Sequence, residues 1–67
     1  MALNQAEKQT LVVIAQGEVT LDGWPAVVSG SRHDFATVTQ LRNGLQVEFA
    51  WPTVAHILAH RDGAFQS

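Results

Sequence analysis

The sequence contains no cysteine, so no disulfide can support the fold and the hydrophobic core alone must stabilise it. Long hydrophobic segments are also missing. The longest uninterrupted apolar run covers residues 11–15, whereas about 20 apolar residues are needed to span a bilayer. The start of the sequence lacks the basic region of a secretory signal peptide. These absences predict a protein without a membrane segment that resides in the cytoplasm.

Charge is scarce as well, and its sign does not suit a general affinity for nucleic acids. Charged residues make up 15% of the sequence, and 4 Lys and Arg against 6 Asp and Glu give a net charge of −2. Binding a polyphosphate would therefore require a local basic patch. Hydrophobic residues reach 46%, more than a disordered chain contains. The chain is expected to fold as a single small domain, residues 1–67.

A helix is predicted near residues 4–15. Asn4 is followed three residues later by Glu7, a close variant of the capping box that begins helices. Gly17 stands where a helix stop is expected. Residues 11–14 include three β-branched side chains and could equally form a buried strand, because periodicity does not separate the two in so short a segment. The start and stop signals favour the helix.

Two hairpins are predicted in the middle of the chain. Asp22-Gly23 is a strong signal for a two-residue turn, which would pair Leu21 with Trp24. Residues 42–44 reverse the chain again, and a three-residue loop with Gly44 at positive φ keeps apolar residues on one face. That loop would pair Leu41 with Leu45, Thr39 with Val47 and Thr37 with Phe49.

The elements predict an α+β fold of two layers, in which a four-stranded antiparallel meander carries the N- and C-terminal helices packed on one face (α-β-β-β-β-α). The expected strands cover residues 18–22, 24–29, 35–41 and 45–50, and the second helix covers residues 52–61. The expected core consists of Leu11, Ile14, Val19, Leu21, Phe35, Leu41, Val47, Phe49, Ile57 and Leu58. The other face of the sheet is expected to expose Val27, Ala36, Val38 and Ala50.

No specific motif for catalysis, cofactor binding or metal binding occurs in the sequence. His56 and His60 are four residues apart on the second predicted helix, a spacing at which two imidazoles can meet one metal ion. Asp62 or a second subunit would have to supply further ligands. The residue types of a hydrolytic triad crowd into residues 31–34, where turn chemistry is the simpler explanation. The sequence therefore predicts no catalytic residues, no cofactor and no metal site.

The apolar side chains of the open sheet face favour a protein-binding role. A short chain without disulfides gains stability by burying such a face, and a symmetric homodimer is the commonest way to do so. The predicted function is that of a small accessory or regulatory protein that binds itself and a larger protein. The residues expected at its contact surface are Trp24, Val27, Arg32, His33 and Val38.

A nucleic-acid-binding regulator is the alternative prediction. Arg32 and Arg42 are candidate phosphate contacts, and Trp24 and Trp51 could stack on bases. However, the predicted meander places the two arginines at opposite ends of one strand, and alternation places both tryptophans with the core-facing side chains. An oligomeric enzyme or metal binder with a site between subunits is a weaker alternative.

Overall fold

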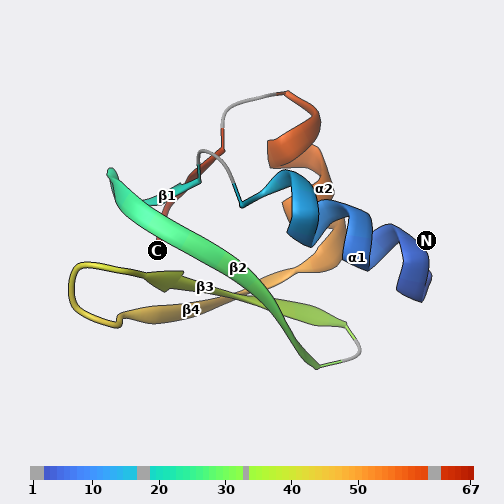
Figure 1. Ribbon diagram of the computed structural model, residues 1–67, viewed down its shortest axis with the longest axis horizontal. Helices are drawn as coiled ribbons and strands as arrows, with labels where there is room; N and C mark the ends of the chain where they lie inside the picture. Colours follow the sequence, from blue (N-terminus) through green and yellow to red (C-terminus); the bar gives the residue numbers. More distant parts are fainter. Residues whose placement is uncertain (1–2, 17–18, 33, 61–62) are drawn as a thin grey trace.

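The computed structural model describes residues 3–16, 19–32, 34–60 and 63–67, with the backbone alone at residues 31–32. The described residues form two helices beside a sheet of five strands, and Figure 1 shows their arrangement. In chain order the elements are α1 (Gln5–Ile14), β1 (Thr20–Leu21), β2 (Trp24–Arg32), β3 (Phe35–Gln40), β4 (Gln46–Ala50), α2 (Trp51–Ala59) and β5 (Ala64–Phe65).

The capping box predicted at the start of α1 is present. Asn4 Oδ1 accepts a hydrogen bond from Glu7 N at 2.8 Å, and Glu7 Oε1 accepts one from Asn4 N at 3.0 Å. The β-branched segment that follows is helical, because the cap fixes the start of the helix and both Leu11 and Val12 pack against the core. The packed side also contains Lys8, whose ammonium lies 5.8 Å from the centre of the Trp51 ring.

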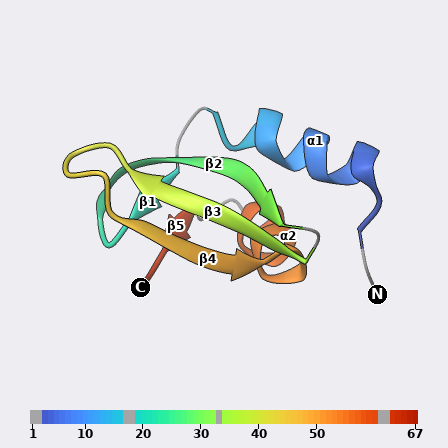
Figure 2. The same ribbon diagram turned by 90° about the horizontal axis from the view of Figure 1, so that it is seen from below.

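The sheet confirms the predicted α+β, two-layer architecture and adds one strand to it. The strand order is β4-β3-β2-β1-β5, so β1 to β4 form the expected antiparallel meander. The additional strand β5 pairs in parallel with β1, with Phe65 beside Leu21. Figure 2 shows α1 and α2 at the end of the sheet away from the β3–β4 loop. Buried residues of the sheet and of α2 form one core with Ala15, the residue that caps the C-terminal end of α1.

The turn between β1 and β2 has the predicted two residues. Asp22 and Gly23 both have positive φ angles, 53° and 85°, as a type I′ turn requires. Leu21 pairs with Trp24 as expected. The Asp-Gly sequence alone therefore determined the register of this hairpin.

The predicted register of the β3–β4 hairpin is wrong by one residue. The loop contains four residues, 41–44, because Gln40 N donates to Leu45 O at 2.7 Å. Gly44 has the predicted positive φ, 75°. Val47 consequently pairs with Val38, whereas the prediction paired it with Thr39. Because side chains alternate along a strand, this shift turns the opposite face of β3 towards the core.

The register shift corrects the assignment of the sheet faces. Ala36 and Val38, predicted on the open face, are fully buried. Gln40 is buried beside them, and its Nε2 donates to Leu21 O at 2.7 Å. The side chains of the other face are mostly hydroxyl-bearing or polar: Ser29, Thr37, Thr39, Gln46 and Glu48.

The predicted core is correct in part. Val19 and Leu21 are buried, and five of the other expected members pack against the core while half-buried: Leu11, Val47, Phe49, Ile57 and Leu58. Phe35 is half-buried on the open face. Ile14 and Leu41 are exposed, because Ile14 lies on the outer side of α1 and Leu41 belongs to the β3–β4 loop.

Ser67 is tied to the β1–β2 turn by the carboxylate of Asp22. Ser67 Oγ donates to Oδ2 at 2.7 Å and Ser67 N donates to Oδ1 at 2.8 Å. These two hydrogen bonds hold the pKa of Asp22 below its ordinary value of 3.8, and the bond from the Ser67 hydroxyl contributes most. A lowered folded-state pKa adds stability above the ordinary value, and that stability is lost as the pH falls through the folded-state pKa.

We therefore expect Ser67→Ala to be less stable than the wild type at neutral pH and equally stable at a pH well below 3.8. Urea denaturation of both proteins at each pH measures the difference. A difference that stays constant over this range would show that the charge on Asp22 does not stabilise the fold through Ser67.

Candidate functional site

Several exposed large hydrophobic side chains lie at one end of the sheet. Four of the six such side chains in the described part of the chain come from β2, from the β3–β4 loop and from the residue that follows this loop: Trp24, Val27, Leu41 and Leu45. The β1–β2 turn and the β3–β4 loop reach this end together, away from the helices (Figures 1 and 2). Leu41 N donates to Pro25 O at 2.9 Å and joins the two hairpins. Trp24, Leu41, Arg42 and Leu45 are called the hairpin-end surface. Val27 is not part of it, because its side chain lies on the open face of the sheet beside Thr39.

A cation–aromatic pair lies at the centre of the hairpin-end surface. The Arg42 guanidinium carbon lies 4.1 Å from the centre of the Trp24 ring. At an exposed site such a contact contributes about 0.5–1 kcal/mol. Trp24 nevertheless remains 47% exposed, whereas Trp51 is 3% exposed and belongs to the core. The predicted burial of both tryptophans is thus correct for Trp51 and wrong for Trp24. Trp24 alternates with the core-facing residues Ala26 and Val28 and pairs with Leu21, but it lies at the end of the strand, where it remains exposed.

The hairpin-end surface contains one of the five residues predicted for contact, Trp24. Val27 is exposed as predicted, but on the open face of the sheet. Val38 is wrong as a contact residue, because the register of β3 buries it completely. The side chain of Arg32 and the whole of His33 lie outside the described residues.

Sequence reasoning missed Leu41 and Leu45 and considered Arg42 only as a phosphate contact. Both leucines are typical core residues, and the pairing with a three-residue loop placed them opposite each other. One more residue in the loop moves Leu41 out of the sheet and leaves it 62% exposed. The available signal was the position of Leu41 directly beside the Arg42-Asn43-Gly44 turn sequence.

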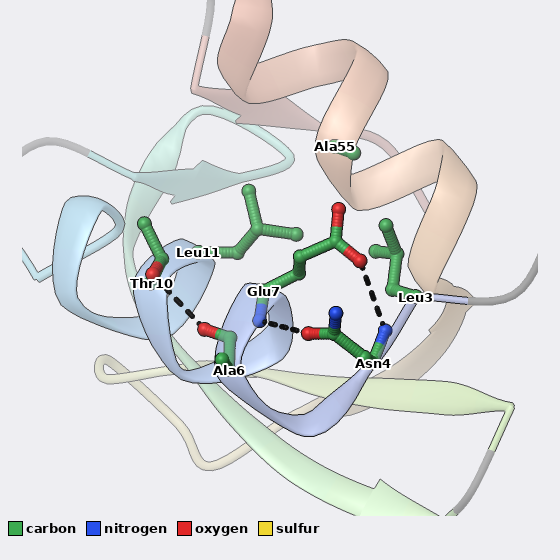
Figure 3. Close-up of a pocket in the computed structure, with 7 residues that line it drawn as sticks. All are labelled: Leu3, Asn4, Ala6, Glu7, Thr10, Leu11 and Ala55. Carbon is green, nitrogen blue, oxygen red and sulfur yellow. Dashed lines mark hydrogen bonds between the residues drawn. The ribbon is translucent and has the colours of Figure 1, made fainter.

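A groove between α1 and α2 is a second candidate site (Figure 3). It has a volume of about 370 Å³ and is lined by Leu3, Asn4, Ala6, Glu7, Thr10, Leu11 and Ala55. Its polar groups are engaged within α1, since Thr10 Oγ1 donates to Ala6 O at 3.0 Å and Glu7 forms the cap. The groove is therefore mostly apolar and has no catalytic arrangement of side chains.

His56 of α2 and His60, the residue that caps its C-terminal end, lie next to each other, as their spacing predicted. The ring centres of His56 and His60 are 4.2 Å apart with a tilt of 43°, and both side chains are exposed. Asp62, the expected additional ligand, lies outside the described residues. Among the described residues, no group of three or more potential ligands could hold a metal ion.

Comparisons of the chain with protein-family models, with curated proteins and with solved structures found no significant match. Within the described residues, neither helix is long and apolar enough to cross a membrane. We therefore infer the function of this chain from its own surfaces.

Proposed function

We propose that this is a small accessory or regulatory protein that acts by binding other proteins through the hairpin-end surface. The exposed stack of Trp24 and Arg42, flanked by Leu41 and Leu45, carries the proposal. Tryptophan and arginine are enriched among the residues that dominate binding energies at protein interfaces. The stack also holds both side chains in place before binding, which lowers the entropy lost on association. The polar open face of the sheet offers no comparable group of side chains.

We further propose that the hairpin-end surface forms a homodimer. Together with the adjacent β1–β2 turn it is charge-complementary to itself, because the turn carries exposed Asp22, whose carboxylate accepts from Ser67, and the β3–β4 loop carries Arg42. In a two-fold dimer each surface meets a copy of itself, so Arg42 of one copy can face Asp22 of the other while the apolar side chains are buried. An interface formed by so few side chains buries little area and gives a weak dimer, so a larger protein can displace the second copy.

The homodimer is tested by sedimentation equilibrium over micromolar to millimolar protein concentrations. We expect the wild type to associate and Trp24→Ser to remain monomeric, since the substitution removes the central side chain of the surface. Intrinsic fluorescence provides a second measurement. Trp51 is already buried, so a blue shift with rising concentration reports the burial of Trp24.

Val13→Ser is the matched control. Val13 is also a large exposed side chain, but it lies on the outer side of α1. Its substitution should therefore leave the dimer intact. Loss of association in both variants would show that general hydrophobicity, and not the hairpin-end surface, drives it. A wild type that stays monomeric at all concentrations would exclude the homodimer.

The larger partner is found by crosslinking from the proposed surface. A photoreactive amino acid at position 41, which is 62% exposed, should give one dominant adduct in cells of the native host. The same group at position 13 should not give this adduct. The purified partner should then bind the wild type and lose about tenfold or more in affinity with Trp24→Ser. Equal affinities would exclude the hairpin-end surface as the contact.

A second candidate function is the binding of single-stranded nucleic acid. An exposed tryptophan beside an arginine is also typical of surfaces on which bases stack, and Trp24 and Arg42 have that arrangement. This function predicts quenching of Trp24 fluorescence by oligonucleotides, with an affinity that falls steeply as salt rises. The net charge of −2 favours the protein-binding proposal.

A further inference from the structure

His56 and His60 form a pair at the C-terminal end of α2, where His60 is the C-cap residue, and the helix is anchored in the core. Trp51 and Val54, in the first turns of α2, are buried in the core. His56 and His60 are exposed one turn apart near the end of the helix. His60 N donates to His56 O at 3.3 Å, so the backbone turn between them is formed. The rings contact each other at 4.2 Å between centres.

We propose that His56 and His60 form a bidentate site for a divalent transition-metal ion, which binds Cu²⁺ more tightly than Zn²⁺. Imidazole nitrogens are suitable ligands for Cu²⁺, Ni²⁺ and Zn²⁺, and for a given site the affinity is highest for Cu²⁺. Mg²⁺ and Ca²⁺ prefer oxygen ligands and do not compete. Water or donors from another molecule complete the coordination of the ion.

The geometry of the pair needs only side-chain rotation to bind an ion. Metal–nitrogen bonds are about 2.0–2.1 Å long for Zn²⁺, so two nitrogens bound to one ion lie roughly 3 Å apart. The rings already touch, and because both are exposed, they can turn one nitrogen each towards a common point. The tilt of 43° between the rings shows that they do not stack in parallel, which leaves their edges free to converge.

Metal binding at this pair also stabilises the folded protein. The two imidazoles are adjacent only when the turn between them is helical, so the ion binds the folded state more tightly than the unfolded chain. The ion joins the C-cap residue of α2 to the last turn of the helix. The first turns of the same helix contain the buried residues Trp51 and Val54. The pair therefore links the presence of a transition metal to the stability of α2.

The test is a titration of the tag-free protein, freed of metal, with Cu²⁺ and with Zn²⁺. We expect one ion per chain by calorimetry, an electron paramagnetic resonance spectrum of nitrogen-coordinated Cu²⁺, and a higher melting temperature with the metal. His60→Ala should weaken Cu²⁺ binding by about tenfold or more, because one of the two ligands is lost. Stronger binding of Zn²⁺ than of Cu²⁺ would contradict the proposed ligand set.

A matched control separates the paired site from the presence of histidines in general. The double variant His56→Ala, Ala59→His keeps the number of histidines but places two of them at adjacent positions, which point about 100° apart on a helix. Ala59 is exposed, so the variant should fold, as circular dichroism would verify. It should bind Cu²⁺ as weakly as His60→Ala. If the double variant bound Cu²⁺ as tightly as the wild type, the proposal would be overturned. A further control, His33→Ala, should bind Cu²⁺ like the wild type.

Discussion

Val38→Lys should unfold the protein. Val38 is fully buried and lies in a row of valines across the sheet, between Val28 of β2 and Val47 of β4. An unpaired ammonium at this position costs several kcal/mol. The whole domain is expected to have a stability of roughly 3–10 kcal/mol, at about 0.05–0.15 kcal/mol per residue. Circular dichroism and urea denaturation should show that most of the variant is unfolded at 25 °C.

Thr37→Lys is the control for this prediction. Thr37 is the preceding residue on β3 and faces the opposite side of the sheet, next to Glu48. A lysine there remains in water and should change the stability by less than about 1 kcal/mol. A folded, soluble Val38→Lys together with a destabilised Thr37→Lys would show that the opposite register is correct, with Val38 on the open face.

Phe65→Ala should destabilise the protein to a comparable extent, although Phe65 lies in the edge strand β5. Phe65 is the largest fully buried side chain among the described residues. Its ring centre lies 5.0 Å from that of Phe49, with an angle of 59° between the rings. Removing a buried phenylalanine side chain costs about 3–5 kcal/mol, since the transfer free energy is lost and a cavity is left. Thermal unfolding followed by circular dichroism should show little or no folded variant at 37 °C.

Ala64→Ser tests whether this effect depends on the side chain of Phe65. Ala64 is exposed and pairs with Thr20 in the same short strand. Its substitution leaves the core unchanged and should alter the stability by less than about 0.5 kcal/mol. If Phe65→Ala unfolded at the wild-type temperature, β5 would not contribute its phenylalanine to the core.

The candidate sites differ in how far the sequence could reveal them. The contact between His56 and His60 follows from a spacing of four residues on a helix, because residues four apart are neighbours there. The hairpin-end surface depends on the meeting of Trp24 and Arg42, which are separated by 17 intervening residues. Their contact requires β2 and β3 to pair in one particular register. No local sequence pattern predicts the register in which β2 and β3 pair.

The sequence by itself determined the features that depend on neighbouring residues. Asn4 and Glu7 form the cap of α1 because their side chains reach backbone groups within one turn. Asp22 and Gly23 form the tight turn because they tolerate positive φ angles. The meander and its two helices follow from these local signals and from alternation, and all of them are present in the structure.

Only the tertiary structure decided which face of β3 is buried and what closes the sheet beyond β1. The strand Phe35–Gln40 alternates, but Thr, Ala and Val suit either face, so the length of the β3–β4 loop determines the choice. The two residues of β5 are too short to show any period. They form a strand because pairing with β1 buries Phe65 between Leu21 and Phe49. The partners that bury Phe65 are distant from it in the sequence.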